Sequence, residues 1–299
     1  MNAGPANAFR GALRGAMRDW ASLIKLSHSV FALPFALLSL LVATGGRPSP
    51  RLLVLCVLAV VAARSAAMAY NRFVDRDVDA ANPRTAGREI PRGAIAARSA
   101  LWFAAGSGAL FVLCCALLGP WCGWLSPPVL GWLLLYSHSK RFTALCHLWL
   151  GTALGLAPVA AWVAARNGFD GVAAPLLLGA GVACWVAGFD VLYACQDEAF
   201  DRGHGLRSIP ARLGASRAML VSRVLHAAAI VLFALFGVQA RLGWGFAVGI
   251  GAAALLLLWQ HRLLRPGDLR RIHAAFFTAN GALSVAMLAA ACADLYLFG

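Results

Sequence analysis

Two short segments hold most of the acidic residues of a chain that is otherwise strongly apolar. Only 12 of the 299 residues are Asp or Glu, whereas 61% are hydrophobic. Eight of these acids lie in two segments, residues 71–93 and 190–201. Carboxylates gathered in this way can bind a metal ion or take part in acid–base chemistry, so both segments are candidate sites of function. The eight are Asp75, Asp77, Asp79 and Glu89 in the first segment, and Asp190, Asp197, Glu198 and Asp201 in the second.

The spacing in the first segment puts three polar side chains on one face of a helix. Asn71, Asp75 and Asp79 follow one another at intervals of four residues, which on an α-helix brings them to the same side. Asp77 falls on the opposite side, where we expect it to be solvated or paired with a neighbouring arginine. Arg64, two helical turns before Asn71, returns to the first face. An arginine at membrane depth is costly and is therefore a functional candidate.

The second segment repeats this arrangement. Asp190, Tyr193, Asp197 and Asp201 lie at offsets of 0, 3, 7 and 11 residues, which share one helix face. Carboxylates from two such faces would repel each other unless a cation lay between them. Oxygen ligands alone favour Mg²⁺, which usually keeps several waters and binds a substrate phosphate. Histidine and cysteine, the ligands that zinc prefers, are absent from both faces.

A basic loop follows each acidic face. Arginine guanidinium groups match the geometry of phosphate oxygens, so carboxylates holding Mg²⁺ with arginines behind them predict a diphosphate site. The alternative is that the acids are solvated and the arginines only set membrane topology. The pattern occurs twice, and an Asn and an Arg lie at membrane depth. We therefore favour a diphosphate site over the alternative. The arginines are Arg84, Arg88 and Arg92 in the first loop, and Arg202, Arg207 and Arg212 in the second.

Long apolar runs must position these segments. The mean hydropathy is +0.74, and each run approaches or exceeds the ~20 residues of a membrane-spanning helix, which is too long for a barrel strand of ~10 residues. We therefore expect an all-α integral membrane protein in the lipid bilayer, with about nine transmembrane helices around a central cavity. The expected helices are 20–43, 51–71, 97–118, 120–137, 144–165, 173–195, 219–240, 243–260 and 273–298, with a break at Gly119-Pro120.

The distribution of cations predicts the orientation of the chain. With these helices, 21 of the 26 Lys and Arg residues fall on one side, which by the positive-inside rule is the cytoplasm. The N-terminus is then cytoplasmic and the C-terminus outside, in the cell (inner) membrane, and the active site faces the cytoplasm. Residues 1–19 form a tail, and residues 20–299 form one polytopic domain with aspartate motifs at 71–79 and 190–201. The asymmetry accounts for the net charge of +14, so we expect no nucleic-acid partner.

These motifs resemble those of the UbiA superfamily of membrane-embedded aromatic prenyltransferases. The resemblance rests on "LSHSVFALPFAL", on both aspartate segments and on "KRFTALCHLWLG" at 140–151. Arg72 follows Asn71 where members of the family typically have Asp. The segments "NRFVDRDVDAANPRT" and "DVLYACQDEAFDRGHGLRSIPARLG" resemble a subgroup similar to 4-hydroxybenzoate polyprenyltransferases, some of which act in the futalosine route to menaquinone.

The resemblance implies an Mg²⁺-dependent enzyme of respiratory quinone biosynthesis. Such an enzyme transfers a polyprenyl group from polyprenyl diphosphate to an aromatic acid of the 4-hydroxybenzoate type, as in ubiquinone biosynthesis. A dihydroxynaphthoate acceptor, as in menaquinone biosynthesis, is an alternative. No residue pattern specifies the prenyl chain length or an oligomeric state.

The resemblance also implies roles for individual residues. Asn71, Asp75 and Asp79 would hold one Mg²⁺, and Asp197 and Asp201 a second. Tyr193 and Asp190 would stabilise the allylic cation. Lys140 and Arg141 would bind the acceptor carboxylate, or serve only as topology charges. The candidates for diphosphate binding are Arg64, Arg72, Arg84, Arg88 and Arg207.

Two functions of other classes are alternatives. An ion-coupled transporter would also carry intramembrane carboxylates, but here the acids gather at one membrane face and no inverted pair of broken helices is evident. A non-catalytic scaffold would tolerate alanine at Asp75 and Asp197. Mg²⁺-dependent release of diphosphate distinguishes the enzyme from both.

Overall fold

The computed structural model describes residues 15–25, 31–265, 267–272 and 274–298, and these residues form helices joined by loops, without a strand among them. The long helices are α2 (Leu33–Ala43), α3 (Pro50–Val74), α5 (Ala97–Leu118), α6 (Pro120–Leu135), α7 (Cys146–Arg166), α8 (Ala173–Ala194), α11 (Ala215–Gln239), α12 (Trp244–Leu263) and α13 (Ala279–Ala293). The short ones are α4 (Arg76–Ala81), α9 (Glu198–Gly203), α10 (Ile209–Leu213), the 3-10 turns η2 (Tyr136–Arg141) and η3 (Cys195–Asp197), and the π-turns η4 (Ala274–Thr278) and η5 (Asp294–Phe298).

Every predicted apolar range contains a helix, but not all of these helices are long enough to cross a membrane. In the described part of the chain, seven helices are sufficiently long and apolar. Helix α6 has 16 residues and α2 has 11, and residues 26–30 of the predicted first helix and of "LSHSVFALPFAL" lie outside the described residues. Nine crossings and the orientation of the termini therefore stay predictions. The break before Pro120 is confirmed, because Gly119 separates α5 from α6 with φ of 145°.

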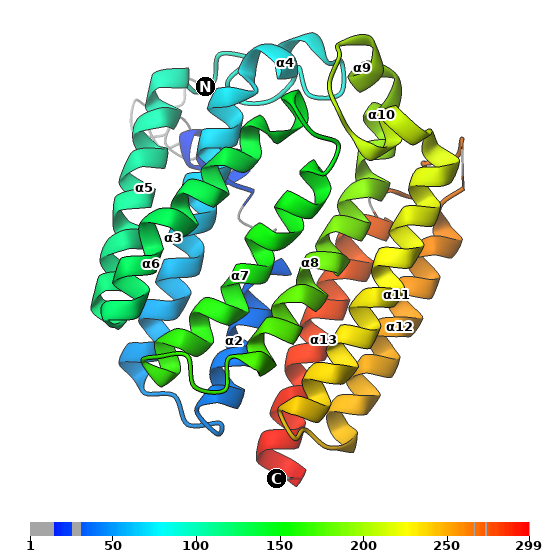
Figure 1. Ribbon diagram of the computed structural model, residues 1–299. Coiled ribbons are helices and arrows are strands. Elements are labelled where there is room, and N and C mark those ends of the chain that lie inside the picture. Colours follow the sequence, from blue (N-terminus) through cyan, green and yellow to red (C-terminus); the bar gives the residue numbers. More distant parts are fainter. Residues whose placement is uncertain (1–14, 26–30, 266, 273, 299) are drawn as a thin grey trace, which may run out of the picture.

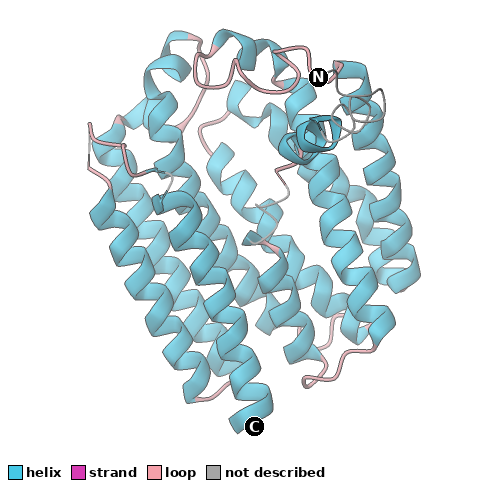
Figure 2. Ribbon diagram, turned by 180° about the vertical axis from the view of Figure 1, so that it is seen from behind, coloured by secondary structure: helices cyan, strands magenta, loops and turns pink. Residues whose placement is uncertain are grey.

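The long helices pack side by side in one bundle, and several of the short helices lie at one end of it (Figure 1). Helices α4, α9 and α10 all lie at this end, which we call the aspartate end, so the two aspartate segments meet there as predicted. Figure 2 shows the same bundle from behind, with the loops gathered at its two ends.

The two halves of the bundle are filled by different side chains. Around α8, α11, α12 and α13 the core is aromatic: Trp185, Phe233 and Phe246 are fully buried, and Phe35 of α2 stacks on Phe233 at 5.5 Å between ring centroids. Around α3, α5 and α6 the buried side chains are mostly alanine and cysteine. Because small side chains fill little space, this second half leaves an apolar cavity of about 310 Å³ among α3, α5, α6 and α7.

Helices α7 and α8 approach each other closely along a glycine contact. A Cβ atom on Gly151 would collide with the carbonyl oxygen of Ala183, and one on Gly155 with that of Gly179. Small residues at such a crossing allow two backbones to touch inside a membrane. This contact brings the ends of α7 and α8 together at the aspartate end of the bundle.

A buried carboxylate organises the opposite end. Asp294 accepts backbone hydrogen bonds from Gly243 (2.6 Å), Gly245 (3.0 Å) and Phe246 (3.1 Å). These N–H groups belong to the first turn of α12, where no intrahelical acceptor exists. Asp294 therefore joins the end of the last helix to the start of α12, and its negative charge lies at the positive end of the α12 dipole.

We expect the substitution Asp294→Ala to lower the free energy of unfolding by at least ~2 kcal/mol, since hydrogen bonds to a charged group contribute about 1.5–3 kcal/mol each. Thermal unfolding in detergent would measure this loss. Asp268→Ala is the control, because the Asp268 side chain is partly exposed and pairs only with Arg270 among the described residues. Equal melting temperatures for the two variants would contradict the capping role.

Candidate active site

The first aspartate segment is a helix with a break in it. Helix α3 ends at Val74 and α4 begins at Arg76, so the predicted continuous helix is interrupted at Asp75. Helical hydrogen bonding nevertheless continues across the break, from the Asp75 N–H to the Asn71 carbonyl (2.9 Å) and from the Asp79 N–H to the Asp75 carbonyl (2.7 Å). As a result the Asn71 amide still donates to the Asp75 carboxylate, with Nδ2 2.8 Å from Oδ2.

Asp77 points away from this group, as predicted. Its side chain is 84% exposed and lies 3.5 Å from the guanidinium of Arg76. Asp77 is therefore the one carboxylate of the first motif that faces solvent, and it offers a control position within the motif.

The second segment turns its carboxylates inward. The chain passes from α8 through η3 into α9, and both Asp197 and Asp201 are buried. Arg84 binds Asp197 through two hydrogen bonds, from Nε to Oδ1 (2.8 Å) and from a terminal nitrogen to Oδ2 (2.5 Å). Asn82 donates a third to Oδ1 (3.1 Å). The loop after the first aspartate motif thus holds the carboxylate of the second.

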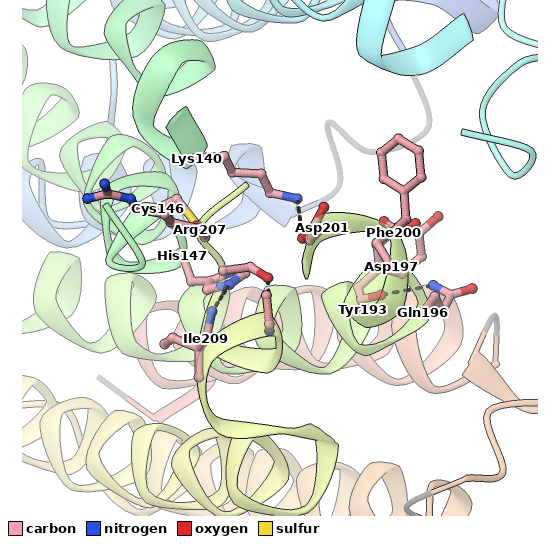
Figure 3. A network of polar contacts seen from close by, with 12 residues as sticks. Lys140, Cys146, His147, Tyr193, Gln196, Asp197, Phe200, Asp201, Arg207 and Ile209 are labelled. Atoms are coloured by element: carbon pink, nitrogen blue, oxygen red, sulfur yellow. Dashed lines mark hydrogen bonds and ion pairs between the residues drawn. The ribbon is translucent and has the colours of Figure 1, made fainter. Parts of the chain in front are cut away.

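Basic side chains lie between the remaining carboxylates. From η2, Lys140 places its Nζ 3.7 Å from Asp201, and Arg141 donates to Asp75 at 3.1 Å. Figure 3 shows Lys140 extended toward Asp201. Arg88 contacts both oxygens of Asp79, at 2.6 and 2.7 Å. The cations that keep the carboxylates from repelling one another are, in this structure, side chains of the protein itself. The pairs are Arg141–Asp75, Arg88–Asp79, Arg84–Asp197 and Lys140–Asp201.

These pairs affect the protonation of the site. Burial by itself lowers the pKa of Lys140, but the attraction of Asp201 and then of Asp190 raises it above its ordinary value, so the ammonium stays charged. Burial raises the pKa of Asp75, and Arg141 offsets part of this rise. The site is therefore a charged network in which each carboxylate depends on its partner.

The donor set fits a hard metal ion. In the described part of the chain, no three His, Cys, Asp or Glu side chains come close enough to hold a metal by themselves. Mg²⁺ does not require such a cage, because it uses one or two carboxylates and completes its shell with waters and phosphate oxygens. Asp201 also has a buried oxygen, Oδ2, without a hydrogen-bond partner. The oxygen atoms of both motifs are thus suited to Mg²⁺.

The candidate arginines are placed differently from one another. Arg84 reaches both Asp197 and Tyr193, with a guanidinium nitrogen 3.2 Å from the tyrosine hydroxyl and the guanidinium carbon 5.3 Å from the ring centroid. Arg72 is buried, and its Nε has no hydrogen-bond partner. Arg64 lies on the wall of the apolar cavity.

Arg207 does not join the carboxylate cluster. Its guanidinium donates to the carbonyl oxygen of Phe142 at 2.8 Å. Figure 3 shows it directed away from Asp201. The backbone of Arg207 donates to the Lys140 carbonyl at 2.7 Å, so this residue joins the second basic loop to η2.

Asp190 pairs with a residue to which the sequence patterns gave no role. His147 Nδ1 lies 2.6 Å from Asp190 Oδ2, and its Nε2 accepts the backbone N–H of Ile209 at 3.3 Å. His147 belongs to "KRFTALCHLWLG". A histidine at the start of an apolar helix is the sequence feature that could have indicated a role for it. Asn82 was missed in the same way, within "DAANPRT".

The chain resembles known proteins along most of its length. Residues 32–281 match the UbiA prenyltransferase family. The 4-hydroxybenzoate octaprenyltransferase of Aromatoleum aromaticum is 31% identical over 242 residues, which cover 81% of each chain. That of Alcanivorax borkumensis is 34% identical over 226 residues, covering 75% of this chain and 76% of the relative.

Solved structures show the same fold. A UbiA homolog from Aeropyrum pernix K1 superimposes with a TM-score of 0.82 at 36% identity, covering 89% of this chain and 98% of that one. A UbiA homolog from Archaeoglobus fulgidus bound to DMAPP and Mg²⁺ does so with a TM-score of 0.70 at 19% identity, covering 93% and 99%. The paired aspartate motifs at one end of a helical bundle, the family match and these relatives together lead to one conclusion: the chain belongs to the UbiA prenyltransferase family.

Proposed function

We propose that this protein transfers a polyprenyl group from its diphosphate to an aromatic acid of the 4-hydroxybenzoate type, in respiratory quinone biosynthesis. One observation carries the proposal: Arg84, from the first aspartate segment, holds Asp197 of the second. The two motifs therefore form one polar site, and Asn71 of that site also lines the apolar cavity. The names of the relatives support 4-hydroxybenzoate as the acceptor. The site would face the cytoplasm from the inner membrane.

Asn71, Asp75 and Asp79 would hold one Mg²⁺, and Asp197 and Asp201 another. Held by these residues, the metal would supply positive charge against the charge that develops on the leaving diphosphate. The homolog from Archaeoglobus fulgidus, which was solved with DMAPP and Mg²⁺ bound together, supports this assignment by family likeness.

The basic side chains would exchange partners when substrate binds. Arg84 and Arg88 are only partly buried, so each can turn from its carboxylate to a phosphate oxygen without leaving the site. The buried Arg72, with its unpartnered Nε, supplies a further anion-binding group. Arg64 is a candidate at the cavity end of the diphosphate. The contact of Arg207 with Phe142 favours a structural role for that arginine instead.

The apolar cavity is suited to the prenyl chain. Its polar end is marked by Asn71, Arg64 and Tyr136, and its wall continues to Cys56 and Phe111. An isoprenoid bound there would place its diphosphate at Asn71 and its tail among apolar side chains, which favours binding through burial of apolar surface.

The reacting carbon would lie near the aromatic and acidic side chains of α8. The rings of Tyr193 and Phe276 are 4.6 Å apart, and π-faces stabilise an allylic cation. Asp190 lies on the same face of α8 as Tyr193. Lys140 and Arg141 reach into the site from η2, where they could bind the carboxylate of the acceptor.

Purified protein in lipid, given a polyprenyl diphosphate and Mg²⁺, should form a prenylated ring and release diphosphate, and EDTA should stop both. Offering 4-hydroxybenzoate and a dihydroxynaphthoate in parallel identifies the acceptor. Product from the naphthoate alone would replace the benzoate assignment. The absence of both product and diphosphate release would favour the transporter.

Asp197→Asn and Asp75→Asn should abolish transfer, since each removes a charge that metal binding needs. The protein should remain folded in detergent because the amide keeps the shape of the carboxylate. Asp77→Asn is the matched control within the same motif and should retain wild-type turnover, as Asp77 is exposed. Equal activity in the three variants would refute the metal assignment.

Arg84→Gln should lower turnover about 10²-fold, the usual cost of removing one group that stabilises developing negative charge. Arg202→Gln is the control, because Arg202 pairs with Glu198 at the exposed edge of the same site. Steady-state rates at saturating Mg²⁺ compare the two variants. A similar loss of turnover in both variants would show that Arg84 has no specific role in the reaction.

A further inference from the structure

His147 and Asp190 form a dyad whose hydrogen bonds have only one consistent direction. The side chain of His147 is 0% exposed, so both ring nitrogens depend on protein partners. The backbone N–H of Ile209 can only donate, so Nε2, which lies 3.3 Å away, must carry a lone pair. The ring proton of the neutral imidazole is then on Nδ1, which donates to Asp190 Oδ2 at 2.6 Å.

Both partners of the histidine are held rigidly. Ile209 is the first residue of α10, where a backbone N–H has no helical acceptor. The glycine contact between α7 and α8, at Gly151 and Gly155, brings the backbones that carry His147 and Asp190 into close approach. Figure 3 shows His147 beside Ile209 below the Lys140–Asp201 pair. The dyad is therefore part of the packed scaffold next to the site.

Asp190 is only partly buried. Its side chain is 19% exposed, and among the described residues His147 provides its only hydrogen bond. The Asp190 charge is close enough to influence the Lys140 ammonium. Asp190 also lies one helical turn before Tyr193 on α8. One oxygen is thus anchored to His147, while the second has no hydrogen-bond partner among the described residues.

We propose that Asp190, oriented by His147, is the base that removes the ring proton after prenyl transfer; this inference rests on the proposed function and applies to an acceptor attacked at a C–H carbon. The C–O bond of the prenyl diphosphate breaks, and its electron pair leaves with the diphosphate. A π pair of the ring forms the new C–C bond. The ring C–H pair then restores aromaticity, and the proton passes to the free oxygen of Asp190 and on to water.

His147 acts as a positioning residue in this scheme. Its Nδ1–H keeps the anchored oxygen of Asp190 in place, and the Ile209 N–H keeps that tautomer. Because the protonated ring intermediate is a strong acid, a carboxylate is sufficient as the base, provided that it lies within reach.

The test compares an acceptor with its ring-deuterated form in lipid-embedded protein. The wild type should show no primary deuterium isotope effect, because proton loss is fast. Asp190→Asn should slow product formation about 10²–10⁴-fold, the range for a lost general base, and should reveal a primary isotope effect. His147→Phe should also slow product formation and reveal a primary isotope effect, both to a smaller degree.

Two further variants separate positioning from folding. His147→Gln can donate to Asp190 and accept from Ile209, so it should restore the rate to within about tenfold of wild type and abolish the isotope effect. His261→Gln removes a histidine that pairs with His226 at 2.9 Å between α12 and α11, and it should show no isotope effect.

Two outcomes would overturn this inference while leaving the proposed function intact. In one, Asp190→Asn and His147→Phe are slow but show no isotope effect; in the other, both variants are as fast as wild type. A wild-type protein that forms no product with any ring would overturn the proposed function and this inference together.

Discussion

The ion pair between Arg84 and Asp197 is the interaction on which the rest of the site depends. Asp197 is buried, and a buried charge is tolerated only when a partner and hydrogen bonds compensate for lost water. Arg84 supplies both, and it also contacts the hydroxyl and ring of Tyr193. A single side chain from the loop after the first aspartate motif thus sets the position of the second motif and of an aromatic ring beside it.

The same requirement explains why η2 lies between the motifs. Lys140 and Arg141 are neighbours in sequence, yet one contacts Asp201 and the other Asp75. Four carboxylates brought to one end of a membrane bundle would repel one another without such pairing. Under the proposed function, Arg84 and Arg88 would exchange their carboxylates for phosphate oxygens, and Lys140 and Arg141 would exchange theirs for the carboxylate of the acceptor.

The two halves of the bundle differ in how completely side chains fill them. Aromatic side chains such as Trp185 and Phe233 fill the half that contains α8, α11, α12 and α13, and give that half a rigid core. Alanines and cysteines line the other half and leave the cavity open. The α7–α8 contact lies between the two, so the His147–Asp190 dyad is fixed at the border of the rigid half, next to the space where an isoprenoid would bind.

The sequence by itself determined the features that depend on near neighbours. Hydropathy located the helices, because each apolar run must satisfy its own backbone hydrogen bonds in a membrane. Helical periodicity predicted that Asn71 and Asp75 share one face and that Asp77 lies on the opposite side. The position of Gly119 before Pro120 predicted the break between α5 and α6.

Only the tertiary structure decided which side chains meet across the bundle. Arg84 and Asp197 are 113 residues apart, and His147 and Asp190 are 43 apart, so no local period relates them. The inward position of Arg84 and the outward turn of Arg207 could not be distinguished by spacing, since both follow an aspartate motif in a basic loop. The physical reason is that periodicity fixes the face of a helix, whereas the partner of that face depends on how glycines, aromatic rings and buried charges let the helices pack.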